Sequence, residues 1–207
     1  NENQFFKLGH FSTDSKKIDS FDYVIYAGSL GRFVRNDLLS FSTQPYLKPL
    51  KNYIDEELDE INKTYRSFKI GVSWKSFKNR YASEKSLSIN DFINIFEIKN
   101  SIFFNIQYGD IQNELDNFLK KNTYKIITLK NLDLFNDFTG LANLLTKLDL
   151  FVTVSNSTAH LASALGVKTI LIKPENHASF HYWSYENGKT PWYNSVSIIS
   201  KADLVEA

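Results

Sequence analysis

The fold of this chain is indicated most clearly by one stretch, Leu150-Phe151-Val152-Thr153-Val154-Ser155-Asn156-Ser157-Thr158-Ala159-His160-Leu161-Ala162. Its first five residues are apolar or β-branched and predict a buried strand. Residues 158–165 predict a helix, and Gly166 is expected to end it because glycine commonly follows the last helical residue. A buried strand that runs through a short polar turn into a helix is the building unit of a parallel sheet.

The same alternation of strands and helices extends in both directions from this stretch. Further strands are expected at 68–74, 102–106, 125–129 and 169–172, and further helices at about 54–61, 88–98, 111–121 and 141–148. Strands without a polar face, separated by helices of about 10 residues, are typical of crossover connections. We therefore expect an α/β fold with a doubly wound, mostly parallel sheet.

Residues 1–50 differ in character from the rest of the chain. They contain one clear apolar run, Tyr23–Ala27, and then Pro45 and Pro49, which interrupt the chain as at a boundary between units. Regular alternation begins at residue 51, so residues 51–207 are expected to form the domain. Methionine is absent even from position 1, which indicates a piece excised from a longer protein.

The composition excludes several classes of function. The 207 residues carry 24 Lys and Arg against 23 Asp and Glu, so no basic field is available to hold nucleic acid. The absence of cysteine excludes disulfides, thiolate metal sites and a cysteine nucleophile. No apolar run approaches the roughly 20 residues of a membrane helix, and no signal-peptide pattern begins the chain. We expect no nucleic-acid partner, no membrane span and a cytoplasmic location.

Common catalytic motifs are also missing from the sequence. It contains no glycine-rich dinucleotide fingerprint, Walker loop or nucleophile elbow, so dehydrogenases, NTPases and esterases are disfavoured. Only four histidines occur. His177 and His181 have a spacing that permits metal binding on a helix, but no carboxylate is suitably placed beside them. We expect no metal cofactor.

Two loops that follow strands carry residues suited to an anion, because ligands of open parallel sheets bind at the carboxyl ends of the strands. The first loop consists of Ser155, Asn156, Ser157 and Thr158, with His160 in the first turn of the helix. Unpaired N–H groups at a helix start, together with the helix dipole, favour a phosphate. Simple helix capping by Ser155 or Asn156 would explain the same pattern.

The second loop combines hydroxyls with cations and follows the strand expected at 68–74. It contains Ser73, Lys75, Ser76, Lys78 and Arg80. Lysine and arginine are good phosphate partners, although runs of charge more often form a solvated loop. Because both loops follow strands of the same sheet, we expect a divided site for a phosphorylated ligand.

A polar-aromatic segment lies near the carboxyl end of the chain. It contains His177, His181, Tyr182, Trp183, Tyr185, Trp192 and Tyr193. Its rings could stack on a base or a sugar, and its histidines could bind hydroxyls. Packing within a surface loop would explain the segment equally well.

Several separated motifs resemble one family of enzymes. They are Ile70-Gly71-Val72-Ser73-Trp74-Lys75-Ser76, Lys85-Ser86-Leu87, Asn105-Ile106-Gln107-Tyr108-Gly109-Asp110, Asn136-Asp137-Phe138, the stretch 148–166 and Pro191-Trp192-Tyr193. Their order and spacing resemble the carboxyl-terminal domain of the bacterial glycosyltransferases that follow tetratricopeptide repeats. That domain is related to lipopolysaccharide heptosyltransferases and, more distantly, to O-linked N-acetylglucosamine transferases. Pro45-Tyr46-Leu47 resembles the stretch that closes the first domain of such proteins.

The resemblance implies a GT-B enzyme of two Rossmann-like domains, in which the second domain holds a nucleotide-diphosphate sugar without a metal. Residues 1–50 would then be the tail of the preceding acceptor domain or a linker, and residues 51–207 the nucleotide-sugar-binding domain. By the same resemblance the phosphate-binding residues are Ser73, Lys75, Ser155, Asn156, Ser157, Thr158 and His160. Those that line the nucleoside or sugar are Gln107, Tyr108, Asp137, Phe138, His181 and Trp183. Many relatives have an Asp-Thr pair where this chain has Ser155-Asn156-Ser157, a change that keeps donors at the helix start.

The implied activity is transfer of a hexosyl or heptosyl group to a hydroxyl of a glycan, lipid or protein acceptor. The acceptor site and the usual catalytic base of such enzymes belong to the missing half, so this piece could bind donor and transfer nothing alone. The alternative is a non-catalytic nucleotide-sugar-binding or scaffolding module with the same fold. A phosphosugar epimerase is a weaker third alternative, because its acidic catalytic residues cannot be placed here.

Overall fold

A computed structural model describes residues 25, 29–50, 56–77, 81–175, 180–183 and 186–204. The chain divides into two compact units, Asn1–Phe41 and Ser42–Ala207. In the first unit the described elements are α2 (Gly31–Val34) and the 3₁₀ helix η3 (Leu38–Ser40). The apolar run at 23–27 lies outside the described residues, apart from the exposed Ile25. The division falls earlier in the chain than the boundary expected at residue 50.

The second unit is built on a six-stranded sheet in which every neighbouring pair of strands is parallel. The strands are β1 (Phe68–Ser73), β2 (Ser101–Asn105), β3 (Ile126–Ile127), β4 (Leu150–Thr153), β5 (Thr169–Lys173) and β6 (Val196–Ser200). Their order is β3-β2-β1-β4-β5-β6. In this order the winding reverses between β1 and β4, and such a switch point is where ligands of open α/β sheets bind. The prediction of a doubly wound parallel sheet is confirmed.

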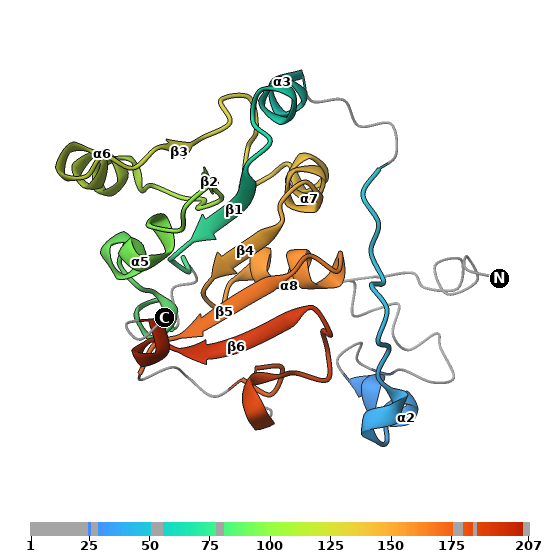
Figure 1. Cartoon of the computed structure of the whole chain (residues 1–207). Coiled ribbons are helices and arrows are strands. Elements are labelled where there is room, and N and C mark those ends of the chain that lie inside the picture. Colours follow the sequence, from blue (N-terminus) through green and yellow to red (C-terminus); the bar gives the residue numbers. More distant parts are fainter. Residues whose placement is uncertain are drawn as a thin grey trace, which may run out of the picture. The chain divides into compact units, whose positions relative to one another are not determined.

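Helices cover both faces of the sheet. The α-helices are α3 (Glu56–Thr64), α4 (Ala82–Lys85), α5 (Ile93–Phe96), α6 (Gln112–Lys121), α7 (Phe138–Thr146) and α8 (Ser157–Ala164). The 3₁₀ helices are η4 (Ile89–Phe92), η5 (Glu186–Gly188) and η6 (Ala202–Leu204). One face carries α5 and α6, and the other carries α3, α7 and α8 (Figure 1).

Several elements differ from the prediction. The helix expected at 88–98 begins as the 3₁₀ helix η4, where Ser88 and Asp91 form a reciprocal capping box. Helix α7 begins at Phe138, earlier than expected, because the Asp137 side chain accepts a hydrogen bond from the Gly140 N–H. Strand β6, at the edge of the sheet beside β5, was not predicted.

The core is formed by side chains that alternate between the two faces of the central strands. Ile70 and Val72 of β1 pack toward α5 and α6. Gly71 faces the other side, where a Cβ atom would lie 2.5 Å from the Leu148 side chain and 3.1 Å from that of Phe151. In the described part of the chain, no helix has the length and apolar character needed to cross a membrane.

Candidate functional site

The carboxyl ends of β1 and β4 are tied together by the side chain of Asn156. Its Nδ2 donates to the Ser73 Oγ at 3.0 Å and to the Lys75 carbonyl at 3.3 Å. Its Oδ1 accepts from the Ala159 N–H at 2.9 Å and so caps α8. One buried amide therefore fixes the start of the helix relative to the loop after β1.

The start of α8 presents backbone donors. Capping by Asn156 satisfies the Ala159 N–H, but the N–H groups of Ser157 and Thr158 donate to no protein acceptor among the described residues. The Ser157 side chain is exposed, whereas that of Thr158 is buried. These two N–H groups lie at the positive end of the helix dipole, a setting that is chemically suited to an anion.

The loop after β1 is held on its other side by Gln107. The Gln107 Oε1 accepts three hydrogen bonds, from the Ser73 hydroxyl at 3.1 Å, the Trp74 N–H at 2.7 Å and the Lys75 N–H at 2.6 Å. Its Nε2 donates to the Tyr108 carbonyl at 2.8 Å. Gln107 is buried, so it shapes the loop rather than offering a free amide to a ligand.

A cavity of about 260 Å³, here called the α8 cavity, lies beside the start of α8. Its lining residues are Ser76, Lys85, Tyr108, Ser155, Asn156, Ser157, His160 and Tyr182. None of these described residues is acidic, and Lys85 is only 7% exposed, with its Nζ 4.3 Å from the centre of the Phe180 ring. A lysine ammonium that lines a cavity together with hydroxyl and imidazole groups suits an anionic ligand.

The cation of this cavity is therefore Lys85, whereas the sequence pointed to Lys75. The Lys75 ammonium is ion-paired with Glu114 in the first turn of α6. Lys78 and Arg80 lie outside the described residues. Lys85 belongs to Lys85-Ser86-Leu87, one of the motifs that carry the family resemblance. The sequence did not show that the Lys85 side chain would line a cavity.

His160 lies in an aromatic cage formed by Tyr182, Trp183 and Tyr193. Its ring stacks on Trp183 with centroids 4.6 Å apart and meets Tyr182 edge-on at 4.7 Å. Its Nδ1 is 2.9 Å from the Tyr193 hydroxyl. Burial, with smaller effects of the charges on Lys85 and His181, lowers the pKa of His160 from 6.5 to about 4. The imidazole is consequently neutral near pH 7.

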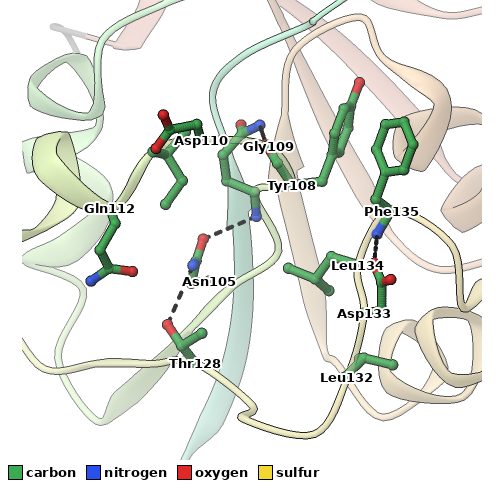
Figure 2. A pocket seen from close by; sticks show the side chains of 12 residues that line it. Asn105, Tyr108, Gly109, Asp110, Gln112, Thr128, Leu132, Asp133, Leu134 and Phe135 are labelled. Atoms are coloured by element: carbon green, nitrogen blue, oxygen red, sulfur yellow. Dashed lines mark hydrogen bonds between the residues drawn. The ribbon is translucent and has the colours of Figure 1, made fainter.

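Two further cavities continue along the same edge of the sheet. The aromatic cavity, of about 480 Å³, is lined by Phe77, Tyr108, Leu134, Phe135, Asn136, Phe138, Leu141, Ser157 and Thr158. The β2 cavity, of about 290 Å³, lies at the ends of β2 and β3, and its lining includes Asn105, Asp110, Thr128 and Asp133. Figure 2 shows the Tyr108 and Phe135 rings next to each other at one side of the β2 cavity, with their centroids 6.0 Å apart. Tyr108 lines all three cavities.

The remaining residues suggested by the sequence fall into different surroundings. Trp183 is buried and donates from Nε1 to the Ser155 hydroxyl at 3.0 Å, so these two side chains hold the carboxyl-terminal segment against α8. Asp137 caps α7, while Phe138 is 58% exposed and lines the aromatic cavity. His181 is exposed, against Tyr182 and Trp192, and His177 lies outside the described residues.

The structure also brings residues to the site that the sequence did not single out. Phe77 and Phe135 line the aromatic cavity. Phe77 and Phe135 stand in loops that follow β1 and β3, and only the fold shows that these loops converge. In the described part of the chain, no group of three or more His, Asp or Glu side chains is arranged to hold a metal ion.

Comparison with known proteins places the fold among those of glycosyltransferases. No protein-family model matches the chain. It superposes on the glycosyl transferase family 9 protein of Veillonella parvula with a TM-score of 0.53, at 15% identity, over 76% of this chain and 44% of that one. It superposes on the ADP-heptose lipopolysaccharide heptosyltransferase II of Escherichia coli with a TM-score of 0.52, at 10% identity, over 81% and 52% of the two chains. At these identities the likeness establishes a shared Rossmann-like fold.

A relative by sequence is Protein FlbA of Caulobacter vibrioides. The two are 25% identical over 180 residues, which cover 86% of this chain and 30% of FlbA. The chain therefore spans less than a third of this relative and about half of each of the two solved structures.

Proposed function

We propose that this chain is the donor-binding half of a glycosyltransferase. It holds a nucleotide-diphosphate sugar, and the complete protein transfers the sugar to a hydroxyl of a glycan, lipid or protein acceptor without a metal ion. The observation that carries the proposal is the α8 cavity, which is lined by the buried Lys85 and by Ser157, whose N–H donates to no protein acceptor among the described residues.

These groups suit a diphosphate leaving group. As an acceptor oxygen attacks the anomeric carbon, the bond from that carbon to the diphosphate oxygen breaks and the diphosphate gains negative charge. Fixed N–H donors and a cation stabilise that charge more strongly in the transition state than in the ground state. Lys85 supplies the positive charge that a divalent metal provides in other transferases.

The nucleoside is assigned to the aromatic cavity. Ser157 lines both this cavity and the α8 cavity, so one ligand can extend from one to the other. Phe135 and Phe138 expose their rings to the aromatic cavity and can stack on a base. The adjoining β2 cavity offers the carboxylate of Asp110 to ribose hydroxyls or base amino groups, whereas that of Asp133 accepts hydrogen bonds from Phe135 and Asn136.

Calorimetric titration of the chain with uridine, guanosine, adenosine and cytidine diphosphates tests the binding step. We expect at least one of them to bind, with affinity unchanged by EDTA and weakened about tenfold by Lys85→Ala. Lys168→Ala is the matched control, because Lys168 is exposed and directly precedes β5, at the opposite edge of the sheet. Absence of binding by all four nucleotides, or equal losses in the two variants, would contradict the proposal.

The transfer step needs the full-length protein. Hydrolysis or transfer of radiolabelled sugar from the nucleotide sugar that binds, lost in full-length Lys85→Ala and kept in Lys168→Ala, is the expected result. Tight binding without any release of sugar from any donor would instead identify a non-catalytic binding module.

A further inference from the structure

Tyr193 links His160 to a second hydroxyl farther from the cavity. The Tyr193 hydroxyl lies 2.9 Å from His160 Nδ1, and the hydroxyl oxygens of Tyr46 and Tyr193 are 3.4 Å apart. The rings of Tyr46 and Tyr193 are stacked, with centroids 6.3 Å apart. All three residues belong to the unit Ser42–Ala207.

We propose that Tyr193 is a positioning residue, which donates its hydroxyl proton to His160 Nδ1 and so keeps the imidazole proton on Nε2. In this tautomer His160 is a hydrogen-bond donor toward the α8 cavity. The inference rests on the proposed function for its consequence, a hydrogen bond to a diphosphate or sugar oxygen, but the tautomer itself can be measured on the free protein.

The chemistry of the Tyr193–His160 pair supports this tautomer. A neutral imidazole has one N–H and one acceptor nitrogen, and the partner of one nitrogen determines where the proton lies. A phenol hydroxyl is a stronger hydrogen-bond donor than the N–H of a neutral imidazole, so in the pair at 2.9 Å the Tyr193 hydroxyl donates and His160 Nδ1 accepts. Nδ1 is then the acceptor, and the proton is on Nε2.

The backbone holds this arrangement in place. The N–H groups of Tyr46 and Leu47 both donate to the Ala164 carbonyl at the end of α8, each at 3.1 Å. The Pro45 ring lies against Gly166, which has a φ of +78°. The segment that carries Tyr46 is thus bound to the same helix that carries His160, so the hydroxyl and the imidazole keep a fixed separation.

The chemistry of the cavity favours a donor at Nε2. His160 lines the α8 cavity with Lys85 and Ser157, and the cavity has no acidic lining residue among those described. The Lys85 ammonium and the Ser157 N–H are donors. An Nε2–H completes a set of donors around one anion, whereas a lone pair at Nε2 would repel the anion that the other groups attract.

The tautomer is read directly from the ¹⁵N chemical shifts of the His160 ring in the free protein at pH 7. We expect the Nε2–H form in the unmodified protein and a mixture of both tautomers in Tyr193→Phe, which keeps the ring and removes the hydroxyl. Tyr124→Phe is the matched control, because it removes a hydroxyl that bonds to Glu97, remote from the site. An Nδ1–H form in the unmodified protein overturns the proposal, and this result does not depend on whether the variant folds. An unchanged tautomer in folded Tyr193→Phe overturns it as well.

A second arm measures the consequence for binding. The probe is the nucleoside diphosphate that binds most tightly in the titrations above. The side chain of His160→Gln can place an N–H near the position of Nε2, whereas that of His160→Asn can place one only near Nδ1. We expect the Gln variant to bind within about threefold of the unmodified protein and the Asn variant about tenfold more weakly. The reverse order overturns the inference, while failure of all four nucleotides to bind the unmodified protein refutes the proposed function and leaves the tautomer measurement valid.

Discussion

The side-chain amide of Asn156 donates a hydrogen bond to the Ser73 hydroxyl at 3.0 Å, across the point where the winding of the sheet reverses. Ser73 ends β1, whereas Asn156 caps α8 just after the adjacent strand β4, and the two residues are 83 positions apart in the sequence. The hydroxyl in turn donates to Gln107 Oε1, so that three strand ends are joined by buried polar side chains. This network fixes the start of α8 relative to the loop after β1.

The Asn156–Ser73 contact predicts a measurable coupling between the two side chains. Asn156→Thr keeps a capping oxygen and removes the amide donors, whereas Asn156→Ala removes both. We expect the free energy of unfolding to fall by about 1 kcal/mol in the Thr variant and about 2–3 kcal/mol in the Ala variant. Urea denaturation of Asn156→Thr, Ser73→Ala and the double variant should give a coupling energy of about 1 kcal/mol. Additive effects would show that the contact does not stabilise the loop.

Gly71 predicts a packing limit at the centre of the sheet. A Cβ atom there would meet Leu148, Ile106 and Phe151, all part of the core beneath α7. We expect Gly71→Ala to lower the free energy of unfolding by about 1–3 kcal/mol, since the neighbours of β1 cannot move without disturbing the core. Gly31→Ala is the control, because no atom lies within 4 Å of its Cβ position. Equal stability of the two variants would contradict this account of the core.

The sequence predicted the sheet well because its central strands are buried on both faces. The apolar runs that became β1, β4 and β5 have few polar residues, and Gly166 ends α8 as expected, with a positive φ of +78°. Strand β6 escaped prediction because Ser197 faces solvent between the buried Val196 and Ile198, and the strand follows an aromatic loop without a preceding helix.

The order of residues could not show that Lys85, rather than Lys75, lines the α8 cavity. Lys75 directly follows the Trp74 that ends the buried run, but its backbone N–H is held by Gln107 and its side chain reaches α6. Lys85 lies ten residues farther along, and it returns to the site because the Leu87 N–H donates to the Trp74 carbonyl at 2.8 Å. A long-range backbone hydrogen bond of this kind leaves no local sequence signal.

The exposed rings of the aromatic cavity predict a loss of nucleotide binding without a loss of stability. Phe135 and Phe138 are 64% and 58% exposed, so truncation removes little buried surface. We expect Phe135→Ala and Phe138→Ala each to weaken the binding of a nucleoside diphosphate about fivefold, as the loss of one stacked ring would. Phe68→Ala is the control, since this exposed ring begins β1 at the other edge of the sheet. Full affinity in the double variant would place the base elsewhere.

The lowered pKa of His160 predicts a specific pH dependence of stability. The pKa falls from 6.5 to about 4 on folding, mainly because the ring is buried, and the groups facing it are Lys85, His181, Tyr182 and Tyr193. Below pH 6.5 the imidazole of His160 is protonated in the unfolded chain, whereas in the folded chain it is protonated only near pH 4. The free energy of unfolding that His160 contributes is therefore lost as the pH falls from 6.5 to about 4. Between pH 7 and pH 4 the contribution of His160 to the free energy of unfolding should fall by roughly 2–4 kcal/mol.

Urea denaturation of the unmodified protein and of His160→Gln, each at pH 7 and pH 4.5, isolates this contribution. The carboxylates titrate alike in both proteins, so the difference between the two pH dependences belongs to His160. We expect the stability of the unmodified protein to fall more steeply than that of the variant as the pH decreases. Parallel curves would mean that the imidazole accepts its proton as readily in the folded protein as in the unfolded chain, which its cage of three aromatic rings and the neighbouring ammonium of Lys85 should prevent.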